Sequence, residues 1–407
     1  MADFHQGGSV TTLHRLVPAS LDALEDELQE FSRSRPIALV LPCLFAEFSR
    51  PAIRHIIDEL HHVRYLDQVV VSLGKATIDD LAATKAAFST LPQRVSIVWN
   101  DGPAMQSLYA LLATYGLGVP QDGKGRSCWI ANGYVLADGR CDVIAAHDCD
   151  IKTYSRELPA RLCYPVANPH LAFDFAKGYY ARISDGLNGR VTRLLVTPLI
   201  HTLRTILGEQ PILTYLDSFR YALAGEFAMR ADLARVNRVP CNWGLEIGLL
   251  AEVYRHCGPR RVCQTEICSN YDHKHQPLSA EDPSKGLAKM AIDISEVLLR
   301  TLAGEGVVFT PGLLKTLAAG YGRVAEDTID RYEADAAING LPYDRHGEET
   351  MAAVFGRGLI AACERYWEGA AIAPTIPSWQ RVESAIPGFF DLLREAVEGD
   401  SAATAAA

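Results

Sequence analysis

The chain has 407 residues, 48% of them hydrophobic and 22% charged, proportions typical of a soluble globular protein. Its length allows one large domain or two closely joined ones. The formal net charge of -10 gives no basic excess, which argues against a nucleic-acid-binding protein. Any phosphate group must therefore be bound by a local cluster of side chains.

Neither a membrane span nor a secretory signal is predicted. Residues 1–10 lack the basic region and apolar run of a signal peptide. No stretch reaches the roughly 18 consecutive apolar residues that a membrane span needs. The ten cysteines include no Cys-x-x-Cys pair, which favours reduced and mostly buried thiols. We therefore expect a cytoplasmic protein.

The first 150 residues alternate between helical and strand patterns. Helices are predicted over residues 12–33, 51–60, 78–88, 104–115 and 128–137, and strands over residues 36–42, 67–72, 94–99 and 141–147. Four alternations predict an α/β fold with a largely parallel sheet and helices on both faces. Ligands of such sheets bind beyond the carboxyl ends of the strands, so functional residues are expected at that edge.

The remainder of the chain is mixed and then helical. We predict a strand over 162–167, a strand or hairpin over 173–183, and helices over 190–207, 243–254, 285–304, 312–336, 347–367 and 379–397, the last with a break at Pro387-Gly388. The chain then divides into an N-terminal helix, an α/β domain, a C-terminal helical region and a disordered tail, at residues 1–34, 35–280, 281–400 and 401–407.

A pair of carboxylates follows the fourth predicted strand. Residues two apart in an extended chain point the same way, so Asp148 and Asp150 would face one site at the sheet edge. A hard divalent cation takes oxygen ligands and usually keeps substrate phosphates as the rest of its shell. The alternative is two solvated aspartates at a strand end. The position after the fourth strand favours the metal site.

Two segments combine glycine with basic side chains where a helix is predicted to begin. Residues 123–126 read Gly-Lys-Gly-Arg, which lets an anion approach the backbone beside Lys124, although the P-loop spacing is absent. Residues 188–193 combine Gly189, two arginines and Thr192, which suits a phosphate or carboxylate. A solvated turn and a simple helix cap are the alternatives.

Two further features could be functional or structural. Glu246 interrupts an apolar helix pattern, where a carboxylate must be paired, for instance with an arginine, or functional. His273 and His275 lie two residues apart in a polar segment, which places both rings on one side of an extended chain. That segment alone displays fewer ligands than a zinc site needs.

Taken in order, these motifs resemble the glucosyl-3-phosphoglycerate synthase family over about residues 36–280, with a weaker similarity in the C-terminal helices. The shared series comprises Pro42-Cys-Leu44, Gly123-Lys124-Gly125, Asp148-x-Asp150, Gly189-Arg190-x-Thr192, Ala224-Gly225-Glu226, Gly244-Leu-Glu246-Ile-Gly248 and His273 before Pro277-Leu278. This family contains retaining nucleotide-sugar glycosyltransferases related to mannosylglycerate and glucosylglycerate synthases. The resemblance implies a GT-A type, Rossmann-like fold with a donor half at 35–150, an acceptor half at 151–280, and a homodimer.

The resemblance also implies roles for the matching residues. It implies that Asp150 and His273 bind the metal, Mg²⁺ or Mn²⁺, and that Asp150, Lys124 and Glu246 take part in catalysis. The residues implied to bind the donor are Pro42, Leu44, Glu47, Ser72, Lys124, Asp148, Cys149 and Asp150. Those implied to bind the acceptor are Gly189, Arg190, Thr192, Trp243 and His275.

The implied reaction moves glucose from a nucleoside diphosphate to the 2-hydroxyl of 3-phosphoglycerate with retention at the anomeric carbon. Lys124 would support the leaving group electrostatically, while Arg190 and Thr192 would orient the acceptor by its phosphate. We see no obvious protein nucleophile, so our hypothesis is attack on the same face, with the leaving phosphate accepting the proton. Glu246 is the rival candidate, as a nucleophile or a sugar-orienting group.

Several alternatives stay open at the level of sequence. The acceptor could be glycerate, the sugar mannose, and the donor base uracil, adenine or guanine. A sugar nucleotidyltransferase shares the sheet and the carboxylates, but it needs a glycine-rich loop after the first strand, where this chain has none. A non-catalytic nucleotide-sugar-binding protein is the remaining alternative, and binding without turnover would identify it.

Overall fold

The computed structural model describes residues 6–16, 20–119, 122–273, 282, 284–369 and 375–403. Within them, eight strands form one sheet in the order β1-β8-β6-β7-β5-β2-β3-β4. The strands are β1 (Thr11–Leu13), β2 (Ile37–Leu44), β3 (Leu66–Gly74), β4 (Arg94–Trp99), β5 (Val143–Ala146), β6 (Phe175–Tyr179), β7 (Phe227–Arg230) and β8 (Val262–Glu266). Only β7 runs antiparallel to its neighbours, β5 and β6, so the expected largely parallel sheet is confirmed.

Both faces of the sheet are covered by helices, as the alternating pattern predicts. One face carries α1 (Leu21–Phe31), α2 (Pro51–Leu60), α3 (Ile78–Phe88) and α6 (Glu157–Ala167). Along β2, Leu39 and Leu41 pack into that layer, whereas Ala38 and Val40 pack into the other. A strand buried on both faces reads as a continuous apolar run, which is why β2 was predictable from the sequence.

The second face carries the remaining helices, including the C-terminal region. They are α4 (Pro103–Thr114), α5 (Lys124–Asp138), the π-helical turn η2 (Thr192–Val196), α7 (Thr197–Leu207), α8 (Pro211–Asp217), α9 (Ala231–Val236), α10 (Leu245–His256), α11 (Gly286–Gly304), α12 (Pro311–Ile338), α13 (Arg345–Trp367), α14 (Trp379–Ala385) and α15 (Phe389–Ala403). The short 3-10 turns are η1 (Phe45–Ser49) and η3 (Pro259–Arg261).

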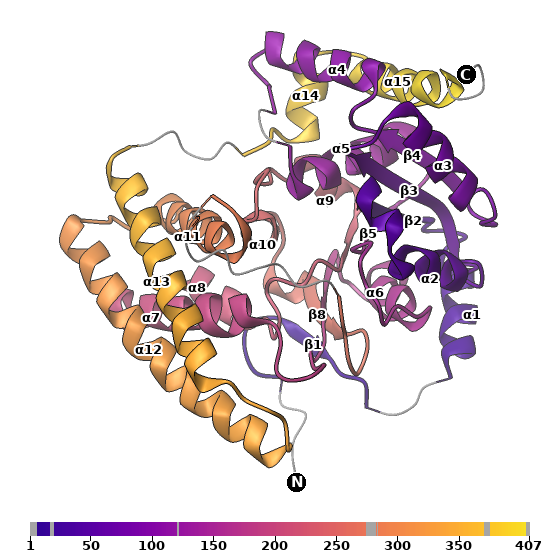
Figure 1. Ribbon diagram of the computed structural model, residues 1–407. Helices are drawn as coiled ribbons and strands as arrows, with labels where there is room; N and C mark the ends of the chain where they lie inside the picture. The colour runs from indigo at the N-terminus through magenta and orange to yellow at the C-terminus, as the bar shows by residue number, and fades with distance from the viewer. Residues whose placement is uncertain are drawn as a thin grey trace.

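The C-terminal helices attach to the sheet domain at two places. In Figure 1, α11, α12 and α13 lie together with α7 and α8 on the left, while α15 lies beside α4 at the top. Trp379 of α14 stacks on Trp129 of α5, with ring centroids 4.0 Å apart. The indole N–H of each tryptophan donates to a backbone carbonyl on the other segment. These contacts join the end of the chain to α5.

Three sequence predictions need correction. The helix expected over 12–33 is a strand, β1, followed by α1, because Thr11–Leu13 pairs with β8 and forms the edge of the sheet. The strand expected over 162–167 is the second half of α6, whose apolar residues are covered by both the sheet and α1, so the run carries no clear period. The tail expected from 401 remains helical to Ala403.

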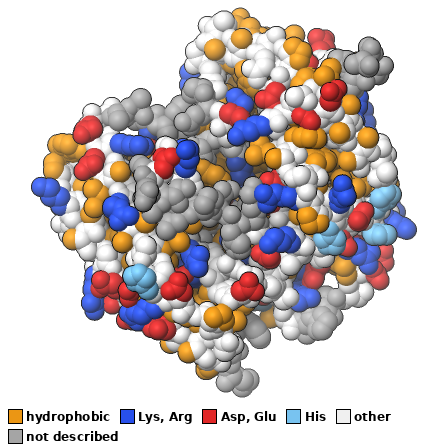
Figure 2. Space-filling model, viewed as in Figure 1, with side chains coloured by type: hydrophobic (Ala, Val, Ile, Leu, Met, Phe, Trp, Pro, Cys, Tyr) orange, Lys and Arg blue, Asp and Glu red, His pale blue; other side chains and the backbone are white. Residues whose placement is uncertain are grey.

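The described helices and the surface add two observations. None of the helices in the described ranges is both long and apolar enough to cross a membrane. Figure 2 shows Lys and Arg side chains interspersed with Asp and Glu over the face it displays. On the described part of that face the charge is therefore mixed rather than basic.

Candidate active site

Three side chains that could hold a metal ion meet just beyond the end of β5. Asp148 and Asp150 follow the strand directly, and a short antiparallel bridge between Ile151 and His273 brings the histidine beside them. The ligand atoms of Asp148, Asp150 and His273 all lie within 4.8 Å of one another. The distance from His273 Nδ1 to Asp150 Oδ1 is 3.7 Å. Two carboxylates and one imidazole at this spacing can hold one divalent cation.

The side chain between the two aspartates points the other way. Cys149 is buried in the layer that also contains Cys43, on the α2 and α6 side of the sheet. Asp148 and Asp150 therefore share one side with Cys149 opposite, as the sequence predicts, although Cys149 and Asp150 lie in a turn rather than in an extended strand. The thiol of Cys149 is therefore enclosed in the core, and only its backbone could meet a donor.

The electrostatics of the two aspartates differ. Burial and the neighbouring carboxylate of Asp148 raise the pKa of Asp150 to about 7. Burial also acts to raise the pKa of Asp148, but the ammonium group of Lys124 outweighs it and the pKa is lowered. Lys124 neutralises Asp148 but leaves Asp150 with a raised pKa. A divalent cation fits this donor set, because its charge would stabilise the ionised form of both carboxylates.

Lys124 joins the carboxylate site to the helix α10. Its Nζ lies 2.7 Å from Asp148 Oδ1 and 3.1 Å from Glu246 Oε1, in the first turn of α10. Lys124 is also the first residue of α5, so the helix begins four residues earlier than predicted. The adjoining Gly125 is required by close packing, because a Cβ there would lie 2.0 Å from the carbonyl oxygen of Pro240. Glu246 is therefore buried and paired, with a lysine as its partner.

A buried carboxylate, Glu226, holds the tyrosine that contacts the ring of His273. Glu226 accepts hydrogen bonds from the hydroxyls of Tyr180 and Tyr271, both at 2.7 Å. The two tyrosine rings stack at 3.9 Å, and the Tyr271 ring lies 5.4 Å from the ring of His273. Glu226 has no exposed surface, and burial raises its pKa. This network fixes the segment that carries His273.

A buried lysine supports the same region and was missed by sequence reasoning. Lys177 lies in the middle of β6, has no exposed surface, and donates a hydrogen bond of 2.6 Å to the carbonyl oxygen of Ala224. Burial lowers its pKa to about 8. A lysine inside an apolar strand is the one local signal that could have identified it, since lysine is almost never fully buried without a partner.

Gly225 provides a test of how tightly Asp148 is held. A Cβ on Gly225 would lie 2.5 Å from Asp148 Oδ2, so Gly225→Ala must displace that carboxylate. We expect kcat/KM for glycosyl transfer to fall about 10- to 100-fold, because small displacements of positioning groups cost that much. Gly322→Ala in α12 is the control, since a Cβ there meets nothing within 4 Å. Equal activity of both variants would contradict the placement of Asp148.

Metal affinity should depend on pH through Asp150. Its raised pKa of about 7 means that protons compete with the cation below neutrality and not above. We expect the apparent Kd for Mn²⁺ to rise about tenfold for each pH unit below that pKa and to level off above it. Titrations of Mn²⁺ across the neutral range would measure this, and a Kd that does not change with pH would exclude Asp150 as a ligand.

The residues expected to bind the donor base lie at the ends of β2 and β3. Pro42 pairs in register with Ser72, and Leu44, which ends β2, is 42% exposed. Glu47 is buried in η1, and its Oε2 lies 3.3 Å from Arg50 Nε. Ser72 has no exposed surface, and its hydroxyl accepts a hydrogen bond of 2.9 Å from Asn100. In this structure Ser72 lies behind the loop after β2, and its role toward the donor stays a prediction.

The residues expected to bind the acceptor precede α7. Arg190 is 47% exposed, and its Nε donates to Glu348 Oε1 at 2.9 Å. Arg193, in contrast, is 8% exposed and is held by Glu348, by two backbone carbonyls and by the ring of Tyr332. Of these two arginines, Arg190 is therefore the one that is exposed to an anion. His275 lies outside the described residues.

Aromatic side chains connect the acceptor segment to the metal-ligating residues. A Cβ on Gly189, whose φ is +72°, would lie 3.2 Å from the ring of Tyr221. The rings of Tyr221 and Tyr180 lie 5.1 Å apart, and Tyr180 stacks on Tyr271. The hydroxyl oxygen of Thr192 is buried, with no hydrogen-bond partner among the described residues. Trp243 is half-buried directly before α10.

Comparison with known proteins places this arrangement in a family. The chain matches no protein-family model. It is 47% identical to a glucosyl-3-phosphoglycerate synthase of Persephonella marina, covering 98% of this chain and 99% of the relative, and 38% identical to one of Methanococcoides burtonii, covering 98% of both.

The fold is also that of solved members. The glucosyl-3-phosphoglycerate synthase of Mycobacterium tuberculosis, crystallised with Mn²⁺, UDP-glucose and phosphoglyceric acid, is 22% identical with a TM-score of 0.55, over 75% of this chain and 90% of that chain. A crystal form of the same enzyme with Mg²⁺ and UDP gives a TM-score of 0.52 at 22% identity, over 74% of this chain and 88% of that one. This likeness bears out the expected α/β glycosyltransferase fold. On the strength of its near full-length relatives, the chain belongs to the glucosyl-3-phosphoglycerate synthase family.

Proposed function

We propose that this protein transfers glucose from a nucleoside diphosphate, UDP-glucose in the first instance, to the 2-hydroxyl of 3-phosphoglycerate. The observation that carries the proposal is the meeting of Asp148, Asp150 and His273 within 4.8 Å at the carboxyl end of β5. In an open α/β sheet this is the edge where ligands bind. The near full-length relatives named for this activity support the choice of substrates.

The donor diphosphate would lie against the carboxylate site. Asp150 and His273, with Asp148 beside them, would hold Mg²⁺ or Mn²⁺, which when bound supplies positive charge that stabilises the leaving diphosphate. Lys124 is fixed by Asp148 and Glu246, and burial is outweighed by these two carboxylates, so its pKa is raised and its ammonium group stays charged. That fixed cation would stabilise negative charge that develops on the departing oxygen.

The acceptor phosphate would lie against Arg190. The Nε of Arg190 is used by Glu348, which leaves the terminal amino groups of the half-exposed side chain for an oxyanion. Glu348 is 4% exposed and is anchored by Arg193, so the orientation of Arg190 is set by a rigid pair. Fixing the acceptor by its phosphate would supply proximity to the anomeric carbon.

Retention without a protein nucleophile remains our hypothesis for the chemistry. Glu246 is 7% exposed and its carboxylate is engaged by Lys124, an arrangement suited to orienting a sugar hydroxyl. The acceptor hydroxyl would then attack the anomeric carbon on the same face from which the leaving group departs. An oxygen of the leaving phosphate would accept the proton of that hydroxyl. Glu246 as nucleophile is the alternative, and trapping of a glucosyl-Glu246 ester would establish it.

Two neighbouring arginines should respond differently to substitution. Arg190→Gln is expected to raise the KM for 3-phosphoglycerate about tenfold or more with little change in the free energy of unfolding, since a charged hydrogen bond contributes about 1.5–3 kcal/mol. Arg193→Gln breaks a buried ion pair and should instead lower that free energy by about 3–5 kcal/mol. Steady-state kinetics and urea unfolding distinguish them, and an unchanged KM in Arg190→Gln would remove it from the acceptor site.

The experiment that tests the proposal is a matrix of nucleotide sugars against acceptors. UDP-, ADP- and GDP-glucose and GDP-mannose are each combined with 3-phosphoglycerate or glycerate, with Mg²⁺ or with EDTA, and the released nucleotide is measured. Metal-dependent release with a glucose donor and 3-phosphoglycerate is expected. Release with glycerate alone would overturn the acceptor assignment, and binding without release would favour a non-catalytic protein.

The proposal also covers where the protein is located and how many chains assemble. All ten cysteines are buried, which supports a cytoplasmic protein that holds its thiols reduced. We propose a homodimer as well, as the resemblance to the family implies. Light scattering in solution would determine the oligomeric state.

A further inference from the structure

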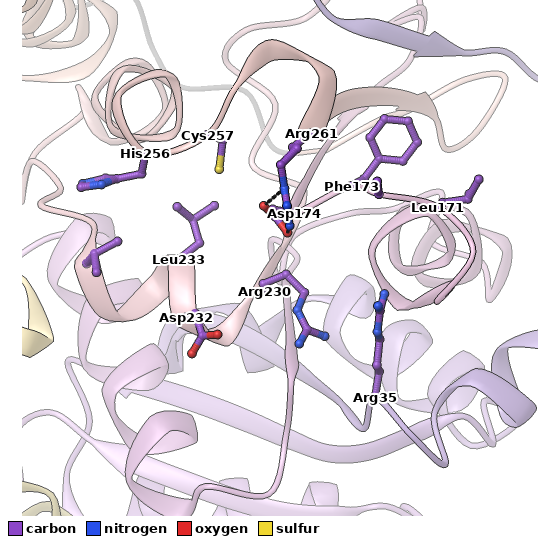
Figure 3. Close-up of a pocket in the computed structure, with 12 residues that line it drawn as sticks. Arg35, Leu171, Phe173, Asp174, Arg230, Asp232, Leu233, His256, Cys257 and Arg261 are labelled. Carbon is purple, nitrogen blue, oxygen red and sulfur yellow. Dashed lines mark hydrogen bonds and ion pairs between the residues drawn. The ribbon is translucent and has the colours of Figure 1, made fainter.

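A cavity lies at the end of the sheet opposite the candidate active site. It occupies about 430 Å³ where β2, β6 and β8 begin and β7 ends (Figure 3). Its walls come from four separate segments: Arg35, Leu171, Ala172, Phe173, Asp174, Arg230, Asp232, Leu233, Val236, His256, Cys257 and Arg261. None of these residues belongs to the donor, acceptor or metal-ligating sets described above.

Two of the arginines in this cavity are held in place without a close carboxylate. Arg35 donates through Nη1 to the carbonyl oxygens of Val166 and Asn168, at 3.2 and 3.1 Å, and no ion pair joins it to an acid among the described residues. Arg230 has its nearest carboxylate, that of Asp142, only at 4.0 Å. Its Nη1 is buried and makes no hydrogen bond within the described part of the chain. Both guanidinium groups are therefore positioned but incompletely satisfied.

The residues that line the cavity include one more arginine than aspartates, in a protein whose formal net charge is -10. Three arginines face two aspartates, and the third arginine, Arg261, is already bonded to Asp174. Asp232 is exposed at the rim. Burial and then the neighbouring Arg230 guanidinium lower the pKa of Arg35, and the carboxylates of Asp142 and Asp174 offset this lowering only in part. Bringing two cations together is unfavourable unless an anion shares them.

We propose that this cavity binds a small organic anion through a phosphate group seated between Arg35 and Arg230. Guanidinium groups recognise phosphate oxygens with paired, directional hydrogen bonds. Figure 3 shows the arginine side chains entering the cavity from separate segments, with Phe173, Leu171 and Leu233 around them. These apolar side chains give room for the carbon skeleton of the ligand beside its charged group. The site is independent of the proposed transfer reaction.

Calorimetric titration with inorganic phosphate tests the site. EDTA is present throughout, and chloride keeps the ionic strength constant. We expect one phosphate per chain at this site and a Kd at least tenfold weaker in Arg230→Gln, because one charged hydrogen-bonding group is lost. Arg140→Gln is the matched control, since that arginine precedes β5, is 62% exposed and does not line the cavity. Arg190→Gln reports separately on the proposed acceptor site.

A second variant keeps the test decisive if Arg230→Gln folds poorly. Asp232→Asn removes a negative charge from the exposed rim and should tighten phosphate binding about two- to fivefold by ordinary Coulomb attraction. Phosphate binding that is lost in Arg190→Gln but unchanged in Arg230→Gln and Asp232→Asn would overturn the proposal. The absence of phosphate binding at millimolar concentrations would overturn it as well.

Discussion

Replacing Asp150 with Asn is expected to lower kcat/KM for glucose transfer by about 1,000-fold or more, equivalent to about 4 kcal/mol of transition-state stabilisation. The change keeps the size of the side chain but removes the charge that a divalent cation needs. Because burial and Asp148 already raise the pKa of Asp150, its neutral analogue should not destabilise the fold. The expected result is thus a well-folded protein with almost no activity.

The control for this variant lies at the other end of the same strand. Asp142 precedes β5, its side chain is 50% exposed, and Asp142→Asn should leave kcat/KM within about twofold of wild type. Release of nucleotide from the donor, with saturating Mg²⁺, measures both variants. If excess Mg²⁺ restored full activity to Asp150→Asn, or if Asp142→Asn were equally impaired, the assignment of Asp150 would be wrong.

Lys124→Gln is expected to have the next largest effect. The lysine is shared by Asp148 and Glu246, at 2.7 and 3.1 Å, and these two carboxylates lose their common cation in the variant. We expect kcat to fall about 100-fold, as for loss of one preorganised electrostatic group. The free energy of unfolding should fall by about 1–3 kcal/mol, since two largely buried carboxylates are left unpaired.

The double variant separates the two effects. Adding Glu246→Gln to Lys124→Gln removes one unpaired carboxylate, so part of the lost stability should return while the activity stays low. Urea unfolding and initial rates on the single and double variants give the comparison. Wild-type turnover in the single variant Glu246→Gln would exclude Glu246 from the mechanism, and wild-type turnover in Lys124→Gln would exclude Lys124.

Local sequence pattern was sufficient for the three strands β2, β3 and β4 and the helices between them. β2, β3 and β4 are apolar runs between amphipathic helices, and their bounds lie close to those predicted. It was insufficient where a strand depends on a distant partner. β1 pairs with β8, which lies some 250 residues later, and β7 is a four-residue strand between two others that belong to distant segments. Neither pairing leaves a local period that a sequence window can detect.

The candidate site shows the same division. The alternation of side chains in an extended segment predicts that Asp148 and Asp150 share a face with Cys149 opposite, and the structure agrees. No pattern indicates that Arg193 is bound by Glu348, 155 residues later, or that Lys124 pairs with Glu246, 122 residues later. Such partners are set by tertiary packing, so a local sequence pattern does not identify them.

The most direct test of the central claim is to count bound Mn²⁺ by electron paramagnetic resonance. Wild-type protein, Asp150→Asn, His273→Gln and Asp142→Asn are titrated in the absence of substrate. Asp150 and His273 come from segments that meet only in the folded chain. We predict one Mn²⁺ per chain in wild type and in Asp142→Asn, and binding weakened about tenfold or more in the other two. Equal Mn²⁺ affinity in all four proteins would contradict the account.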